Sequence, residues 1–245
     1  MTAVFFPGLP ADRRLFVPDR FFMVRDSEWV AVSRRDDPGE WERLVADENE
    51  ALTTRVEDGM WPVSSCSAPW VVRQMIEALR VEPGMRVLEI GTGTGWNAAC
   101  LAALGCEVVS VEIDRDVADE ARGALENAGA TGVVVIAGDG EHGASAYAPF
   151  DRVIATAAVH TVPYPWVAQT REGGRIVVPY TGRGHRAGML VLTVADGSAT
   201  GSIEGEAAFM PLRGQRLRQA DLRAVETVPG LRVEVTAEGQ RLITA

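Results

Sequence analysis

Residues 86–95 read Arg-Val-Leu-Glu-Ile-Gly-Thr-Gly-Thr-Gly, and this stretch decides the fold. Its first half, Arg86–Ile90, predicts a short strand. Its second half, Gly91–Gly95, predicts a sharp turn in which glycines let the backbone approach a ligand without side-chain clash. Residues 96–104 predict a helix that ends at Gly105, a residue suited to a left-handed cap. A strand, a glycine-rich turn and a helix in this order predict the first βαβ unit of a parallel sheet.

The alternation of strands and helices continues on the C-terminal side of this unit. We expect four more strands in the parallel part of the sheet, at residues 107–112, 133–136, 151–156 and 175–178. Helices are expected from Asp114 to about Gly129 and over residues 162–170. The apolar run 133–136 is typical of a strand buried on both faces. The chain is therefore predicted to be an α/β protein with a Rossmann-like, mostly parallel, doubly wound sheet.

Two further strands are expected near the C-terminal end of this sheet. They cover residues 188–194 and 202–212 and are joined by the turn 195–198. A short turn predicts an antiparallel pair, so we expect an antiparallel C-terminal edge. We divide the chain into an N-terminal cap segment (1–60), a core (61–213) and a C-terminal tail (214–245). The cap segment, rich in tryptophan and charge, is expected over the C-terminal edge of the sheet, and the structure of the tail stays open.

Composition excludes several classes of function. With 245 residues and 47% hydrophobic side chains, the chain can bury a sizeable core. A net charge of −10 argues against nucleic acid as a partner, because a phosphate backbone requires a basic face. Three cysteines without a CxxC pair suggest neither disulfides nor a zinc site, and no metal is expected. Without a signal peptide or a long apolar run, we expect a cytoplasmic protein that does not bind membranes.

The glycine turn predicts a nucleotide-like cofactor. Gly91, Gly93 and Gly95 form G-x-G-x-G, one residue shorter than the dinucleotide fingerprint G-x-G-x-x-G. The helix that follows offers free N–H groups to an anion. A tighter turn suits the single carboxylate of S-adenosylmethionine better than a pyrophosphate. The alternative is a plain strand-to-helix turn without a ligand.

Two acidic residues at the ends of the next strands support this interpretation. Glu112 follows Gly91 by 21 residues, the distance at which a carboxylate accepts both ribose hydroxyls. Ile113 comes directly after it. Asp139, followed by Gly140, ends the third strand and could accept a hydrogen bond from the adenine amino group. The alternatives are a solvated Glu112 and an Asp139 that only stabilises its turn.

With these residues placed, the sequence resembles the protein-L-isoaspartate O-methyltransferase family. The resemblance covers most of residues 11 to 181, and the segment Ser65-Cys-Ser-Ala-Pro69 is its most specific part. Its other matching segments are Leu15–Pro18, Leu88–Gly95, Gly138–Gly140, Pro149–Arg152, Val162–Pro163 and Gly173–Pro179. The resemblance implies a Rossmann-like class I methyltransferase that uses S-adenosyl-L-methionine and methylates aspartyl or isoaspartyl carboxylates.

The resemblance also implies roles for single residues. Ser67 matches the active-site serine, and Ser65 stands where a threonine is usual; both are expected to be catalytic by orienting the acceptor. Three neighbours of the site, Cys66, Trp70 and Glu89, are expected beside the cofactor. Apart from the resemblance, His160 follows the strand that ends at Thr156, so it is expected to shape the acceptor pocket together with Ser67, or to be a loop residue. The alternative for the two serines is capping of the helix that starts near Pro69.

The acceptor remains open between two closely related chemistries. The stretch between Pro18 and Ser65 is longer than in the repair enzymes, and Cys66 replaces an aliphatic residue. These departures resemble a bacterial branch that tailors ribosomally made peptides (graspetides, lanthipeptides, lasso peptides) by methylating one aspartate, whose ester closes to an aspartimide. We therefore expect a modified precursor peptide as partner. The first alternative is repair of isoaspartate in damaged proteins; a non-catalytic binder and an oxidoreductase are more distant.

Overall fold

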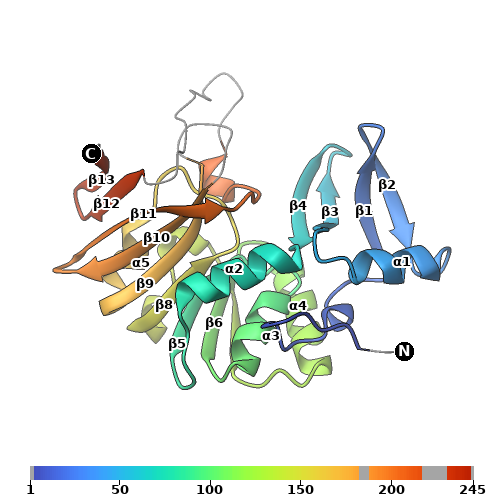
Figure 1. The fold of residues 1–245 in the computed structure, drawn as a ribbon, viewed down its shortest axis with the longest axis horizontal. Helices are drawn as coiled ribbons and strands as arrows, with labels where there is room; N and C mark the ends of the chain where they lie inside the picture. Colours follow the sequence, from blue (N-terminus) through green and yellow to red (C-terminus); the bar gives the residue numbers. More distant parts are fainter. Residues whose placement is uncertain (1–2, 182–187, 217–230, 244–245) are drawn as a thin grey trace.

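In a computed structural model, residues 86–105 form the expected strand, turn and helix. These are β5 (Arg86–Ile90), a turn at Gly91–Gly95, and α3 (Trp96–Ala103). Gly105, after the helix, lies in the left-handed region at φ 89°. The structure describes residues 3–181, 188–216 and 231–243. Two sheets are present, a nine-stranded sheet that contains β5 and a four-stranded sheet built by the N-terminal part of the chain (Figure 1).

The nine-stranded sheet has the order β13-β12-β11-β10-β9-β8-β5-β6-β7. Strands β7, β6, β5, β8 and β9 are parallel, and β9 to β13 pair with one another antiparallel. The predicted class is confirmed: a mostly parallel core with an antiparallel C-terminal edge. Besides β5, its strands are β6 (Glu107–Glu112), β7 (Val133–Ala137), β8 (Phe150–Ala155), β9 (Thr170–Tyr180), β10 (Gly188–Ala195), β11 (Ser198–Glu206), β12 (Arg232–Thr236) and β13 (Gly239–Ile243).

The order of the parallel strands creates a crevice at one edge of the sheet. From β5 the chain moves outward to β6 and β7, then returns to the other side of β5 with β8 and β9. The carboxyl ends of β5 and β8 therefore diverge at a topological switch point, where open α/β sheets bind ligands. The connecting helices α3 and α4 (Arg115–Asn127) lie against β6 and β7.

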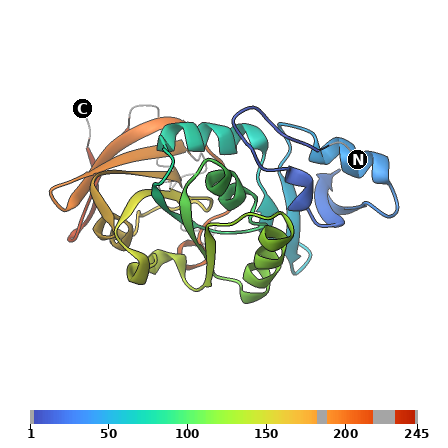
Figure 2. The same cartoon turned by 90° about the horizontal axis from the view of Figure 1, so that it is seen from below.

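Both faces of the central strands are buried, because neighbouring residues contribute to separate clusters of apolar side chains. One face packs against α2 (Pro69–Leu79) and α3, and the other packs against α5 (Tyr164–Ala168), with helices on both sides of the sheet in Figure 2. Val87 and Val108 belong to the first cluster, and their neighbours Leu88 and Val109 belong to the second. Buried strands of this kind are typical of parallel sheets.

Residues before α2 form the four-stranded sheet β2-β1-β3-β4, which is antiparallel throughout. Its elements are β1 (Arg20–Arg25), β2 (Glu28–Ser33), α1 (Pro38–Val45), β3 (Leu52–Glu57) and β4 (Trp61–Cys66). The predicted boundary at residue 60 divides the β3–β4 hairpin, since β4 pairs with β3. Apolar side chains of this region, such as Trp41 and Leu52, belong to the same cluster as those of α2. It therefore shares a core with the large sheet.

Two sequence-based expectations about strands are wrong, and the tail, whose structure the sequence leaves open, adds strands to the large sheet. Among the described residues, β7 is the edge strand of the large sheet, and Val134 on one of its faces is 43% exposed, so β7 is not buried on both faces. β11 covers Ser198–Glu206 instead of 202–212, since the Asp196–Gly197 turn leads directly into it. The tail contributes β12 and β13 to the large sheet; its residues 217–230 lie outside the described part.

Smaller differences concern the helix expected at 162–170 and the cysteines. α5 is limited to Tyr164–Ala168, because Thr170 already pairs with Phe150 at the start of the longer strand β9. All three cysteines are free and buried. Within the described ranges, no helix is long and apolar enough to cross a bilayer.

Candidate active site

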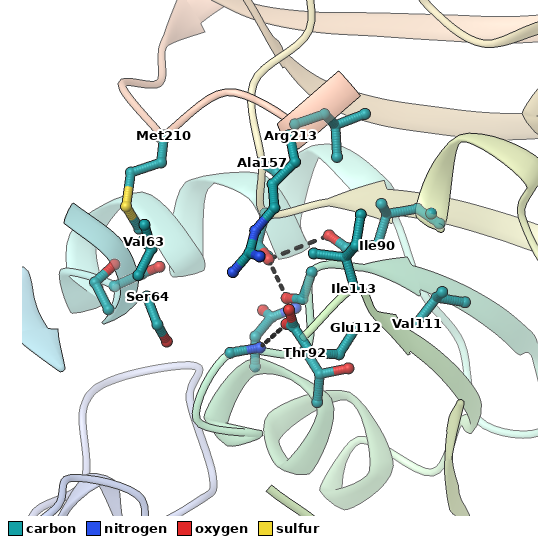
Figure 3. Close-up of a pocket in the computed structure, with 18 of the residues that line it drawn as sticks. Val63, Ser64, Ile90, Thr92, Val111, Glu112, Ile113, Ala157, Met210 and Arg213 are labelled. Atoms are coloured by element: carbon teal, nitrogen blue, oxygen red, sulfur yellow. Dashed lines mark hydrogen bonds between the residues drawn. The ribbon is translucent and has the colours of Figure 1, made fainter. Parts of the chain in front are cut away.

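A cavity lies at the carboxyl ends of β5, β6 and β8, where the strand order reverses (Figure 3). The large sheet supplies Ile90, Val111 and Glu112 to its wall, and the glycine turn supplies Gly91 and Gly93. The β4 strand and the segment after it, with Val63, Ser64, Ser65 and Ser67, form the wall on the N-terminal side. Together with the open space at its mouth, the cavity measures about 930 Å³.

The glycine turn is shaped by close backbone contacts. Gly91, Gly93 and Gly95 all have positive φ angles, 90°, 53° and 87°. A Cβ on Gly91 would lie 2.9 Å from Thr156 Oγ1, and one on Gly93 would lie 3.3 Å from the carbonyl oxygen of Ser65. A larger residue at either position would therefore separate the turn from β8 or from the serine segment, and the cavity would lose its shape.

Glu112 ends β6 and lies on the cavity wall with 8% of its surface exposed. Its Oε2 accepts a hydrogen bond from the backbone N–H of Gly93 at 2.9 Å, and its Oε1 accepts one from the N–H of Asp114 at 3.1 Å. Figure 3 shows the bond to the glycine turn. Each carboxylate oxygen has a second lone pair, so Glu112 is fixed in place and can still accept hydrogen bonds from two hydroxyls of a ligand.

Asp139 and Gly140 follow β7 and line the cavity next to Ile113. Oδ1 of Asp139 accepts a hydrogen bond from the N–H of Glu141 at 2.9 Å and caps a short 3-10 helix. Its Oδ2 lies 3.8 Å from His142 Nδ1, beyond hydrogen-bond length, so one oxygen stabilises the turn and the other can accept a further donor. A Cβ on Gly140 would lie 2.5 Å from Ile90 Cγ2, which explains the glycine at this wall.

Glu89 is expected from the sequence beside the cofactor, but the structure places it beneath the cavity and not among the residues that line it. Strand alternation turns its side chain towards α3, where it is fully buried. Ser110 donates a hydrogen bond to Oε2, and Asn97 Nδ2 donates one to Oε1 at 2.6 Å. Burial raises the pKa of Glu89 to about 7, and the charge of Glu112 adds to this rise, whereas both hydrogen bonds oppose it. Glu89 acts on the site through Asn97, which lines the cavity.

Ser65 and Ser67 both line the cavity, on either side of the end of β4. The capping alternative is not supported, because the N-cap of α2 is Ala68 and no side chain caps the helix. The hydroxyl groups are therefore not used by the helix. The carbonyl oxygen of Ser67 accepts a hydrogen bond from Arg13 Nη2 at 2.9 Å, which fixes the backbone of this segment.

Arg13 connects the N-terminal segment with the serine segment and α3. Its side chain is completely buried and donates hydrogen bonds to five carbonyl oxygens, those of Val45, Asp47, Glu50, Cys66 and Ser67. Its guanidinium also lies over the Trp96 ring, 5.3 Å from the centroid. Trp96 lines the cavity and begins α3. Sequence reasoning missed this role, because the five acceptors are backbone atoms and leave no side-chain pattern.

Four other predicted site residues do not line the cavity. Cys66 alternates with Ser65 on β4, so its side chain is 1% exposed and packs in the core. Trp70 lies on α2 and packs partly against the same core. Gly95 faces Leu125 of α4. His160 lies in a loop, where its N–H donates to Gln215 Oε1 at 3.0 Å and its ring contacts Thr161.

The sequence also gave no indication of the C-terminal side of the cavity. Met210, Leu212, Arg213 and Arg216 line it, together with Pro211. This segment is held against the loop after β8, where the Ala158 N–H donates to the Met210 oxygen at 2.8 Å and the Leu212 N–H donates to the Ala158 oxygen at 2.9 Å. Residues so distant in sequence share no local motif with the glycine turn.

The residues present fit S-adenosylmethionine. Glu112 can accept the ribose hydroxyls, Asp139 Oδ2 can accept an adenine amino group, and the glycine turn leaves room for backbone approach. In addition, Oδ1 of Asn97 is buried without a hydrogen-bond partner among the described residues. A polar cofactor can satisfy such an atom. Fold and site together define a class I S-adenosylmethionine-dependent methyltransferase.

Known proteins agree with this class. The family model described as protein-L-isoaspartate(D-aspartate) O-methyltransferase matches residues 48–217. A protein-L-isoaspartate O-methyltransferase of Methanoculleus marisnigri is 41% identical over 65% of this chain and 73% of its own length. A protein-L-isoaspartate O-methyltransferase of Gloeobacter violaceus is 39% identical over 65% of this chain and 80% of its own length. The chain belongs to the protein-L-isoaspartate(D-aspartate) O-methyltransferase family, and it is an S-adenosylmethionine-dependent O-methyltransferase.

Solved structures show the same fold. A protein-L-isoaspartate O-methyltransferase superimposes with a TM-score of 0.66 at 26% identity, covering 83% of this chain and 77% of the other. A second structure is that of a protein-L-isoaspartate O-methyltransferase from Plasmodium falciparum in complex with S-adenosyl-L-homocysteine. It superimposes with a TM-score of 0.57 at 16% identity, covering 70% of this chain and 83% of the other.

Proposed function

We propose that this enzyme methylates the carboxylate of isoaspartyl residues in peptides and proteins. The observation that carries the proposal is that Ser65 and Ser67 lie in one cavity with the glycine turn and Glu112. The cofactor side and the acceptor side of a methyl transfer would then face each other. The relatives named above are isoaspartate methyltransferases, which favours this acceptor over the aspartate of a tailored peptide expected from the sequence.

The proposed reaction needs no general base. An acceptor carboxylate is ionised at neutral pH, and S-adenosylmethionine supplies, when bound, an electrophilic methyl group on a sulfonium. The protein's task is to hold the two reactants in line and to exclude water. In our proposal the hydroxyls of Ser65 and Ser67 orient the acceptor carboxylate, while Glu112, Asp139 and the glycine turn hold the cofactor.

A matched pair of peptides tests this proposal. The first peptide carries one isoaspartyl residue, and the second has the same sequence with a normal aspartyl residue. We expect methyl transfer from labelled S-adenosylmethionine to the first peptide and little to the second. Equal methylation of both peptides, or methylation of neither, would contradict an isoaspartyl acceptor.

Peptide tailoring is the second candidate, and one observation favours it. Residues before 48 lie outside the family match and build β1, β2 and α1. This region joins the β3–β4 hairpin, whose turn exposes Met60 (64%) and Trp61 (63%). A larger surface beside the site could recognise a modified precursor peptide. Faster methylation of an L-aspartate in a cyclised peptide than of the isoaspartyl test peptide, followed by aspartimide formation, would support tailoring.

A further inference from the structure

Two arginines lie in the segment that forms the C-terminal side of the cavity. Arg213 begins a short 3-10 helix, Arg213–Gln215, and Arg216 follows it; both line the cavity. In Figure 3 the Arg213 side chain extends from this segment into the space between Glu112 and β4. The segment is anchored by Gln215, a buried side chain whose Oε1 accepts from the N–H groups of His160 and Thr161 at 3.0 and 3.1 Å.

The arginines share one carboxylate, Glu57 at the end of β3. Arg213 Nη2 lies 3.7 Å from Glu57 Oε1, and Arg216 Nη1 lies 3.7 Å from Glu57 Oε2. Both distances exceed hydrogen-bond length, so Glu57 balances charge without occupying the N–H donors. Arg213 Nη2 also donates to Asp114 Oδ2 at 3.0 Å, which orients its guanidinium. The side chains are 33% and 41% exposed, so a ligand can reach them.

The charges of the cavity explain why such a pair is useful. Glu112 and Asp139 line the cavity, and their negative charge opposes the entry of another anion. The acceptor in the proposed function is itself a carboxylate. Two guanidinium groups on the C-terminal side of the cavity offset this repulsion, and a guanidinium binds a carboxylate with two parallel N–H donors.

We propose that Arg213 and Arg216 bind the acceptor carboxylate, and that Glu57 is a resident counter-ion which the acceptor replaces. This inference rests on the proposed function, because it assumes a carboxylate acceptor. During transfer the bond from sulfur to the methyl carbon breaks, its electron pair stays on sulfur, and a carboxylate oxygen forms the new bond. The ester is neutral and no longer attracted by the arginines, so Glu57 can return and the product leaves.

Two substitutions separate this role from a purely structural ion pair. Arg216→Gln removes one guanidinium, and Glu57→Gln removes the competing carboxylate. In a structural ion pair both changes break the same contact, so both would act in the same direction. If the arginines bind the acceptor, we expect KM for the isoaspartyl peptide to rise about tenfold in Arg216→Gln. In Glu57→Gln, KM for the same peptide should stay equal or fall.

The measurement combines kinetics with direct binding. We would determine KM and kcat for the peptide, the Kd of S-adenosylhomocysteine, and the Kd of the peptide for the protein loaded with S-adenosylhomocysteine. The expected result is a weaker peptide Kd in Arg216→Gln with an unchanged Kd for S-adenosylhomocysteine. Arg241→Gln is the control, because it removes an equally charged group that pairs with Glu234 at the far edge of the sheet.

The inference is overturned if Arg216→Gln and Glu57→Gln both raise KM, or if Arg216→Gln leaves peptide KM and Kd unchanged while the wild type methylates the peptide. Failure of the proposed function has a different signature, since the wild type would then transfer no methyl group to the isoaspartyl peptide. If Arg241→Gln raised KM as much as Arg216→Gln, total charge rather than binding would be responsible, and the inference would also fall.

Discussion

At the scale of single residues, the site contains acidic side chains with different tasks. Glu112 reaches the cavity from the end of β6, whereas Glu107 begins the same strand at the opposite edge and pairs with Arg86. Glu89 is buried beneath the glycine turn. Chemically similar residues a few positions apart are thus assigned to different places by strand direction and alternation.

Glu112→Ala should weaken the binding of S-adenosylhomocysteine. The lost charge-assisted hydrogen bonds correspond to about 2 kcal/mol, or roughly a thirtyfold rise in Kd. Isothermal titration calorimetry measures this change. Glu107→Ala on the same strand is the matched control and should leave Kd unaltered. An unaltered Kd in Glu112→Ala would show that this carboxylate does not bind the ribose.

Ser67→Ala should reduce turnover without affecting the fold. One neutral hydrogen bond to the acceptor is worth about 1 kcal/mol, which is a fall in kcat of roughly fivefold. Because the Ser67 side chain does not cap α2, Tm and the Kd of S-adenosylhomocysteine should stay the same. A parallel loss of Tm would instead point to a structural role of the hydroxyl.

At the scale of elements, side-chain hydrogen bonds of single arginines hold together segments that are distant in sequence. Arg13 joins the N-terminal segment to the end of β4, and Arg213 joins the C-terminal segment to Asp114 before α4. Neither set of hydrogen bonds corresponds to a sequence motif. Each brings an outer segment to the carboxyl edge of the parallel sheet, where the cavity lies.

Arg13→Met should destabilise the protein strongly. The substitution leaves five carbonyl oxygens without this donor, and breaking a buried polar network of this kind costs about 3 kcal/mol. Urea unfolding of this variant should be compared with that of Arg14→Met, since the side-chain partner of Arg14 within the described ranges is the nearby Asp12. We expect a much smaller change for Arg14→Met. Equal losses in the two variants would contradict the role given to Arg13.

At the scale of the whole molecule, Glu89 should make stability depend on pH. Its pKa is about 7 in the folded protein, above the ordinary value of 4.5, so the folded state binds the proton more tightly. The stability from this group is therefore complete below pH 4.5 and is lost as pH rises to about 7.

Glu89→Gln removes this titration and tests its sign. The difference in free energy of unfolding between the variant and the wild type should shift in favour of the variant by up to about 3 kcal/mol as pH rises from 5 to 8. Urea unfolding at pH 5, 6, 7 and 8 measures the difference. Curves that remain parallel over this range would mean that Glu89 does not titrate there.

The sequence predicted the parts of the fold and site that local patterns encode. The glycine turn, Glu112 and Asp139 follow from strand ends and spacing, and the serines follow from a family motif. The places of Cys66 and Trp70 could not be inferred, because a motif does not tell which face of a strand or helix is buried. Arg213, Arg216 and Arg13 were missed because the contacts that give them a role join segments far apart in the chain.

The hydrogen bond from Arg13 to Ser67 has a practical consequence for shortening the protein. Similarity to the family begins at residue 48, so a fragment that starts there would look complete by alignment. It would keep the glycines, the acidic strand ends and both serines, but it would lack the side chain that supports the Ser67 carbonyl. A trimmed enzyme of this kind should lose the acceptor half of its site while every recognisable motif is still in place.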